Sequence, residues 1–304
     1  MFRPRTRCAD PEPLLNRAVL ILLAGTAGIS FAAVFLRFAA PAPPVVFAFY
    51  RVLFAALLMA AWFAIRRRPL ALAEPGRNLA LLAGVFFGCD MALWHSSLLR
   101  TSVATSTLLV NTTPIYVGFY AVAILGERLD RRFVIGAALA LAGTAVLVGI
   151  PANVRETAAG ALLALAAAFF YAAYLLTVAA VRRSADTIST VFVATLSATA
   201  TLGLFGVLGG DAFHGFPVRS WSMMAAATLV SHLGGVVGIV WALRFVPATA
   251  ASVVLLAQPV LTAIWGWWLL GESIHPIQAL GGGAVLCGIA LATGAPAPKA
   301  AVSP

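Results

Sequence analysis

Ionisable side chains stand inside two long apolar runs of this sequence. Asp90 and His95 lie in the run FFGCDMALWHSS, and His232 lies in the run TLVSHLGGVVG. A carboxylate in such a setting can hold a substrate amine or carry a proton, and an imidazole can relay one because it titrates near neutral pH. Trp94 follows Asp90 by four residues, so the two share one helix face. The alternative is that each polar group is satisfied locally by serines or water, and for His232 this alternative is at least as strong.

Two prolines interrupt other apolar runs. Pro114 and Pro259 each lack a backbone N–H and clash with the carbonyl four residues back, so a helix at either place is predicted to kink. The carbonyls predicted to be left unpaired are those of Val110 and Leu255. Such groups are tolerated at membrane depth only where they face protein or a water-filled cavity. We therefore expect both kinks to border a central cavity, the alternative being that the prolines only shape helix packing.

Polar side chains cluster around the same prolines. Thr107 and Asn111 precede Pro114 on one helix face, and Gln258 directly precedes Pro259. Their hydroxyl and amide groups are suited to a polar substrate head group. The alternative is that the amides bond to neighbouring helices.

Aromatic residues are placed to form an apolar wall beside these groups. Tyr171 and Tyr174 are three residues apart on one helix face, and Trp265 shares a face with Gln258 at i+7. With Trp94 they would complete the mixture of apolar and polar lining that small-molecule sites have. An aromatic core or an interfacial belt is the alternative.

Arg51 is the one basic residue well inside an apolar run. It could hold a substrate carboxylate, but we interpret it as extending its charged end outward along its aliphatic stem to the membrane surface.

The predicted substrate-binding residues are Asp90, Trp94, His95, Thr107, Asn111, Tyr171, Tyr174, His232, Gln258 and Trp265, with helix kinks at Pro114 and Pro259. No catalytic residue, metal site or cofactor is predicted, because the four histidines show no metal-binding spacing and no nucleophile or phosphate-binding motif is present. A membrane-embedded enzyme is therefore the weaker alternative to a transporter. A channel would need a continuous polar stripe, which no run contains.

The composition dictates the elements that must position these residues. Hydrophobic residues make up 62% of the 304 residues, charged residues only 10%, and the mean hydropathy is +0.99. Soluble domains are about half apolar and about a quarter charged, so this chain is a polytopic membrane protein made of helices. Ten spans are predicted, roughly at 17–36, 43–65, 78–98, 103–125, 132–150, 157–181, 187–208, 219–243, 247–270 and 276–294.

We attribute the net charge of +10 to orientation in the membrane rather than to binding of a nucleic acid. With the N-terminus inside and ten spans, most of the 20 basic residues fall on the cytoplasmic side, as the positive-inside rule expects. Both termini are then cytoplasmic, the lipid bilayer is a partner, and no nucleic-acid partner is expected.

The two halves of the sequence repeat each other. Five residues of 99–143 match five of 243–288 at a constant offset: Pro114, Gly126, Glu127, Gly136 and Gly143 correspond to Pro259, Gly271, Glu272, Gly281 and Gly288. A repeat of five helices enters the membrane in the opposite sense the second time. Inverted repeats of this kind are typical of secondary transporters that hold substrate near the midplane.

Residues 242–288, with the pattern A-L-R … W-L-L-G-E … G … G, resemble an EamA domain of the drug/metabolite transporter superfamily, and 99–143 is a weaker copy. The first copy departs from the pattern at 111–113, where Asn-Thr-Thr precedes the proline. The resemblance implies an all-α membrane protein of two inverted five-helix EamA repeats, 17–150 and 157–294, between cytoplasmic tails at 1–16 and 295–304.

The same resemblance implies a function. The chain is similar to the YddG-like amino-acid exporter branch, which implies a monomeric secondary transporter in the bacterial inner membrane. Its expected substrates are small metabolites, aromatic or other neutral amino acids first, moved outward by alternating access. Another substrate class, such as a purine, sugar or drug, is the alternative.

Overall fold

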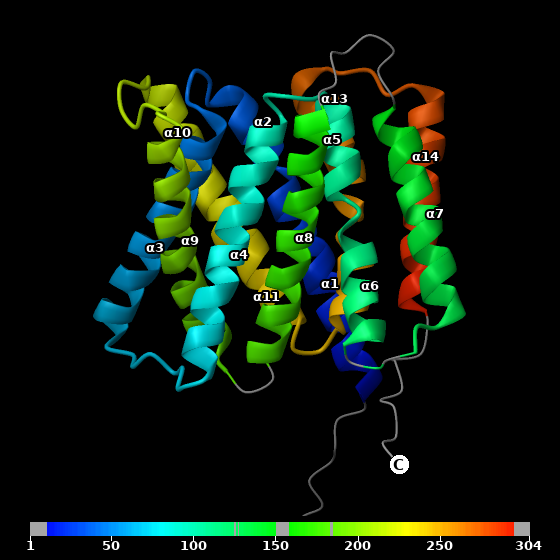
Figure 1. The fold of residues 1–304 in the computed structure, drawn as a ribbon, viewed down its shortest axis with the longest axis horizontal. Helices are drawn as coiled ribbons and strands as arrows, with labels where there is room; N and C mark the ends of the chain where they lie inside the picture. The colour runs from blue at the N-terminus through cyan, green and yellow to red at the C-terminus, as the bar shows by residue number, and fades with distance from the viewer. Residues whose placement is uncertain (1–10, 125, 127, 150–157, 183–184, 295–304) are drawn as a thin grey trace, which may run out of the picture.

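The computed structural model describes residues 11–124, 126, 128–149, 158–182 and 185–294, and every regular element in these ranges is helical (Figure 1). The elements are α1 Pro11–Ser30, α2 Ala32–Phe38, α3 Pro44–Arg66, α4 Gly76–Ser97, α5 Val103–Val110, α6 Thr113–Ala123, α7 Arg131–Val148, α8 Ala158–Val181, α9 Thr187–Leu208, α10 Val218–Ala227, the π-helix η1 Thr228–Val236, α11 Val237–Ala242, α12 Ala248–Val254, α13 Ala257–Leu270 and α14 Pro276–Thr293.

Nine stretches of the described chain are long and apolar enough to cross a membrane. They are α1–α2, α3, α4, α7, α8, α9, α10–η1–α11, α12–α13 and α14. The predicted span at 103–125 differs, because it consists of two helices of 8 and 11 residues that are each too short to span alone. The break falls at Asn111 and Thr112, where side chains donate to carbonyls of the preceding turn beside the backbone N–H groups.

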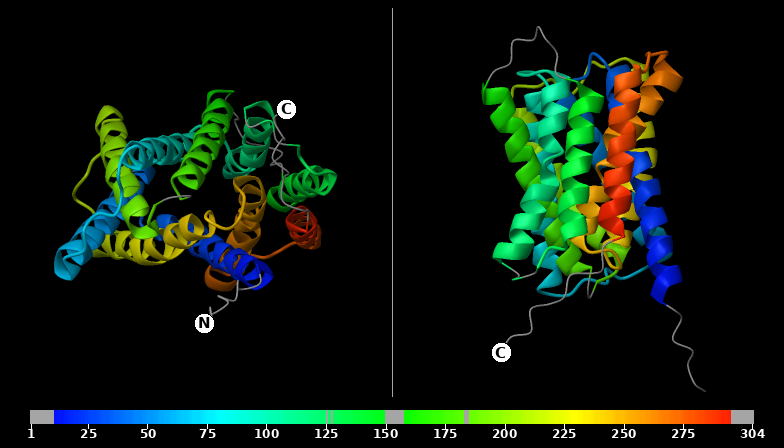
Figure 2. Two further views of the ribbon diagram at one scale, coloured as in Figure 1. Left: turned by 90° about the horizontal axis from the view of Figure 1, so that it is seen from below. Right: turned by 90° about the vertical axis from the view of Figure 1, so that its right-hand side faces the viewer.

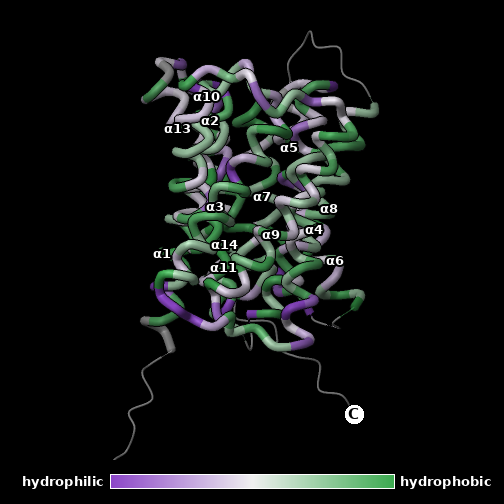
Figure 3. Tube along the Cα trace, turned by 90° about the vertical axis from the view of Figure 1, so that its left-hand side faces the viewer, coloured by the Kyte–Doolittle hydropathy of each residue, from purple (hydrophilic) through white to green (hydrophobic). Residues whose placement is uncertain are grey.

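The helices stand side by side in one bundle with two polar ends. The described chain begins in α1 and finishes in α14 at the same end, which we call the terminal end; the opposite end is the distal end (Figure 1). Hydrophilic segments gather at the two ends and apolar segments lie between them (Figure 3). Large apolar side chains such as Leu57, Phe119 and Leu162 are exposed on the outside of the bundle. Such a surface suits contact with lipid tails.

The last helices of the two repeats, α7 and α14, pack against each other in opposite directions (Figure 2). A methyl group added to Gly136 would lie 2.5 Å from the carbonyl oxygen of Gly288, and one added to Gly143 would lie 2.7 Å from that of Gly281. Gly136 therefore contacts Gly288, which is the repeat counterpart of Gly143. Gly143 in turn contacts Gly281, which is the counterpart of Gly136. Such reciprocal contact is what a two-fold axis between the repeats produces.

Glycines with positive φ end the helices before the last span of each repeat. Gly271 terminates α13 at φ +68°, and its repeat counterpart Gly126 follows α6 at φ +65°. Glycine adopts this left-handed conformation without steric cost, so the matched positions require it. The neighbouring Glu127 lies outside the described residues.

Candidate functional site

A cavity of about 740 Å³ lies at the centre of the bundle. Its lining comes from both repeats, with residues of α1–α2, α3 and α4 facing residues of α8, α11 and α12–α13. The cavity reaches the distal end, where the lining includes the exposed side chains of Arg37 and Glu272. Towards the terminal end the lining residues, among them Tyr174, Val236 and Ser252, are buried. The lining is therefore exposed at the distal end and buried further toward the terminal end.

An ion pair stands at the distal mouth of this cavity. Arg37 at the end of α2 donates to the carboxylate of Glu272, just after α13. The two side chains are 62% and 51% exposed, so water screens the pair. It joins the first repeat to the second across the opening.

Both interrupted helices border the cavity. α5 gives way to α6 at Asn111, and α12 gives way to α13 at Leu255, three or four residues before the prolines. Pro114 and Pro259 each fall in the first turn of the second half-helix, where a proline N–H is not needed. Lining residues come from both breaks, and discontinuous helices of this kind form substrate sites in many secondary transporters.

The carbonyls freed by the two breaks are hydrogen-bonded, contrary to the sequence-based prediction. The hydroxyl of Thr113 donates to the carbonyl of Val110 at 2.8 Å. The backbone N–H of Gln258 donates to the carbonyl of Leu255 at 3.0 Å. A side chain in one repeat and a tighter backbone turn in the other therefore satisfy groups that proline leaves without their usual partner.

Side-chain amides from both breaks line the cavity in different states. The Asn111 amide nitrogen donates to the carbonyl of Thr107 at 2.7 Å, within its own helix. The Gln258 side chain makes no recorded hydrogen bond with any described residue, so both ends of its amide are available to a ligand. Thr107 also lines the cavity.

Two opposite charges line the cavity on adjacent helices. Arg51 of α3 is 6% exposed and Asp90 of α4 is 8% exposed, and they interact electrostatically. No ion pair joins them among the described residues. The interpretation that Arg51 extends outward is wrong, because its guanidinium is buried and donates to the sulfur of Met91 at 2.9 Å. The sequence carried a signal for this inward position. An arginine well inside an apolar span is costly unless it faces the bundle interior.

Aromatic rings form a wall of the cavity. Tyr171 and Tyr174 stack with their centroids 6.0 Å apart, and Phe87 lies 4.8 Å from the Tyr174 ring. Trp94 lines the same space, and its buried indole N–H has no partner among the described residues. Phe87 was not predicted from the sequence, since nothing distinguishes it from the phenylalanine before it.

Three of the predicted residues, His95, Trp265 and His232, lie away from this cavity. His95 is buried, and its Nδ1 lies 2.6 Å from the carbonyl oxygen of Met91 one turn back. Trp265 stacks on Phe31 with centroids 4.4 Å apart and donates to the hydroxyl of Ser30 at 2.7 Å. His95 and Trp265 are therefore held by neighbouring side chains or backbone rather than presented to the cavity.

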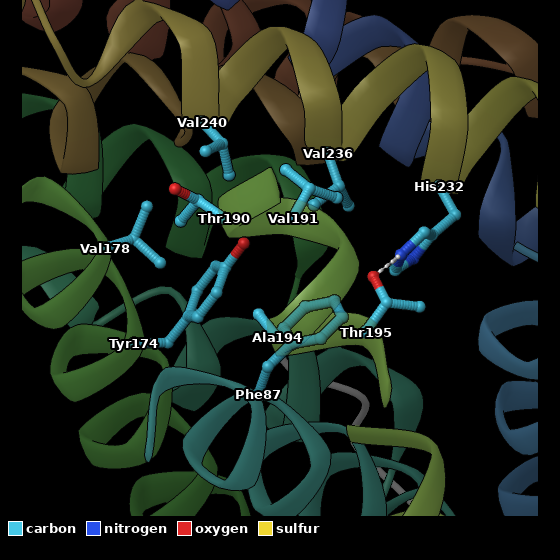
Figure 4. A pocket seen from close by; sticks show the side chains of 10 residues that line it. All are labelled: Phe87, Tyr174, Val178, Thr190, Val191, Ala194, Thr195, His232, Val236 and Val240. Carbon is cyan, nitrogen blue, oxygen red and sulfur yellow. Dashed lines mark hydrogen bonds between the residues drawn. The ribbon is translucent and has the colours of Figure 1, made fainter. Parts of the chain in front are cut away.

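His232 lies in η1 beside a second, very small pocket of about 10 Å³ (Figure 4). Its Nε2 is 2.9 Å from the hydroxyl oxygen of Thr195, and its buried Nδ1 has no partner among the described residues. Phe87, Tyr174 and Val236 line both pockets and separate the histidine from the large cavity. The smaller space is about the size that one water molecule needs.

Membrane-length helices around a central cavity define a multi-pass integral membrane protein. The chain belongs to the EamA-like transporter family, whose model matches residues 16–149 and 158–294.

Relatives of known sequence carry transporter names. The chain is 28% identical over 259 residues to the uncharacterized transporter YwfM of Bacillus subtilis, covering 84% of this chain and 86% of that protein. It is 24% identical over 265 residues to the pseudopaline exporter CntI of Pseudomonas aeruginosa, covering 86% and 91%. A solved crystal structure matches with a TM-score of 0.76 and 22% identity, covering 91% of this chain and 96% of that one, which shows a shared fold.

Proposed function

We propose that this protein is a secondary transporter that exports small metabolites, neutral amino acids first, across a bacterial inner membrane by alternating access. The observation that carries the proposal is the central cavity, in which both repeats contribute polar groups beside an aromatic wall. Its volume of about 740 Å³ falls in the range of small-molecule sites. One relative is named an exporter, which supports the outward direction.

In this proposal the protein crosses the membrane ten times. α5 and α6 together make the additional crossing, because they follow one another across the bundle (Figure 1). The terminal end is cytoplasmic. Basic residues concentrate there, at Arg66, Arg67, Arg68, Arg77, Arg128, Arg131, Arg132, Arg182 and Arg244, as the positive-inside rule predicts.

The transport cycle follows from the inverted repeats. In the structure the cavity reaches the distal end, which corresponds to the state that releases substrate outside. Exchange of the conformations of the two repeats would close that end and open the cytoplasmic one around the same lining residues. The protein needs no cofactor and acts as a monomer in the bilayer.

Counterflow in liposomes tests the function directly. Purified protein is assayed with a panel of amino acids, nucleobases and sugars, with and without a pH gradient. Saturable counterflow of neutral amino acids is expected, and a pH effect would identify proton coupling. Counterflow of only nucleobases or sugars would overturn the substrate assignment, and substrate turnover to a new product would overturn the transporter assignment.

Orientation is tested with single cysteines at Arg131 and Ser273 in a variant whose Cys8, Cys89 and Cys287 are replaced by serine. An impermeant thiol reagent added to intact cells should label the cysteine at 273 and spare that at 131. Labelling of both from one side would contradict the proposed topology.

A further inference from the structure

Arg51 and Asp90 are buried in the middle of an apolar bundle without forming an ion pair with each other. Desolvated charges are costly, and the usual compensation is a direct pair with hydrogen bonds. These two side chains line the same cavity and interact electrostatically, but no hydrogen bond or ion pair joins them among the described residues. We call the Arg51 guanidinium the positive pole and the Asp90 carboxylate the negative pole. Since the two do not pair with each other, a bound ligand can pair with both.

The hydrogen bonds of both groups are incomplete. The Arg51 guanidinium donates to the Met91 sulfur, a weak acceptor, while its Nε has no partner among the described residues. The Asp90 carboxylate, an acceptor of up to about four hydrogen bonds, makes none that the structure records with a described residue. One pole thus lacks an anion and the other lacks a cationic donor.

We propose that the two poles bind the two ends of a zwitterion, the substrate carboxylate at Arg51 and the substrate ammonium at Asp90. An arginine fork matches a carboxylate, and a carboxylate accepts from an ammonium group. The remaining side chain of the substrate lies along the wall formed by Phe87, Tyr171 and Trp94. This proposal rests on the proposed transport function and narrows its substrates to molecules that carry both charges.

The arrangement rejects molecules that carry one charge or none. A simple amine would satisfy Asp90 and leave Arg51 unpaired, and a simple carboxylate would do the reverse. Sites whose buried polar groups are left unpaired by an analogue discriminate strongly against it. Sugars and nucleobases, which are neutral, would leave both poles unpaired.

Three compounds with the same phenyl group separate the two contacts: phenylalanine, phenethylamine and 3-phenylpropionate. Competition with labelled phenylalanine in liposome counterflow should favour phenylalanine over either analogue at least about tenfold in the unaltered protein. Arg51→Gln should weaken phenylalanine and remove its advantage over phenethylamine. Asp90→Asn should remove its advantage over 3-phenylpropionate. The selectivities therefore change in opposite directions.

Matched variants control for folding and for loss of charge. Arg51→Lys and Asp90→Glu keep both charges and should keep the zwitterion preference at lower affinity. Arg77→Gln removes a positive charge from an exposed pair with Glu74, far from the cavity, and should leave all three affinities unchanged. Where a neutral variant fails to fold, its charge-retaining counterpart still decides, since loss of the preference there would contradict the proposal.

The two levels of the proposal fail differently. If the unaltered protein moves no member of the metabolite panel, or only sugars and nucleobases, the transport function for amino acids and this inference are both wrong. If it moves phenylalanine but Arg51→Gln and Asp90→Asn keep its selectivity, the function stands and only the charge assignment is overturned.

Discussion

The two interrupted helices occupy matched places in the two repeats, and their breaks are built from different chemistry. At the α5–α6 break, Asn111, Thr112 and Thr113 each bond a side chain to a carbonyl of the preceding turn. At the α12–α13 break, Leu255 and Leu256 are apolar, and backbone N–H groups satisfy the carbonyls. The repeats thus conserve a backbone shape, while the side chains that maintain it have diverged.

The difference determines which break has polar groups to offer a ligand. In the first repeat the polar side chains are occupied in maintaining the break. In the second, the backbone does this alone and the Gln258 amide is left facing the cavity. An internally symmetric protein therefore lines its cavity asymmetrically.

The largest effect is expected where the repeats remain symmetric, at the α7–α14 contact. An alanine methyl at Gly288 would lie 2.5 Å from the Gly136 carbonyl oxygen and 2.6 Å from the Ala140 backbone nitrogen. Because both are backbone atoms, the whole helix would have to shift to relieve the clash. Gly288→Ala and Gly143→Ala should each destabilise the fold by about 1–3 kcal/mol or more. Denaturation of the detergent-solubilised protein measures this.

Gly283→Ala is the matched control in the same helix, because no atom lies within 4 Å of the added methyl. It should be as stable as the unaltered protein. Equal stability of Gly288→Ala and Gly283→Ala would contradict the close two-fold contact.

A smaller effect is expected at the asymmetric break. Gln258→Ala should weaken substrate affinity by ~1–3 kcal/mol, because it removes an amide that has no competing hydrogen-bond partner among the described residues. Asn111→Ala should change affinity less and stability more, because the Asn111 amide already bonds to Thr107. Binding titrations and denaturation curves on both variants give the comparison. Similar losses of affinity in the two would show that both breaks serve the site equally.

The smallest effect is expected at the distal mouth. Arg37 and Glu272 are largely exposed, and such pairs contribute little to stability. Arg37→Gln should leave stability unchanged and alter the rate of counterflow by no more than a few-fold. A loss of substrate affinity comparable to that of Gln258→Ala would place the binding site nearer the mouth than we propose.

Sequence and structure contributed different parts of the site. Asp90, Trp94, Asn111, Tyr171 and Gln258 could be selected from the sequence because a polar or aromatic residue inside an apolar run needs an explanation. The same reasoning selected His95, which bonds within its own helix, and His232 and Trp265, which bond to neighbouring helices. It also gave the wrong direction for the Arg51 side chain. Position along a span was predictable, and direction around the helix was not.

The physical reason lies in the membrane. Composition and run length determined by themselves that the chain forms membrane-spanning helices, because the hydrocarbon core demands a fixed number of apolar residues with every backbone group bonded internally. The matched prolines and glycines determined the repeat. In a soluble protein, polar residues mark the outer face of each helix, but lipid and protein interior are both apolar, so these helices carry no such mark. Their rotation is set by close contacts between small residues, such as Gly143 with Gly281, and only the tertiary structure decided which side chains face the cavity.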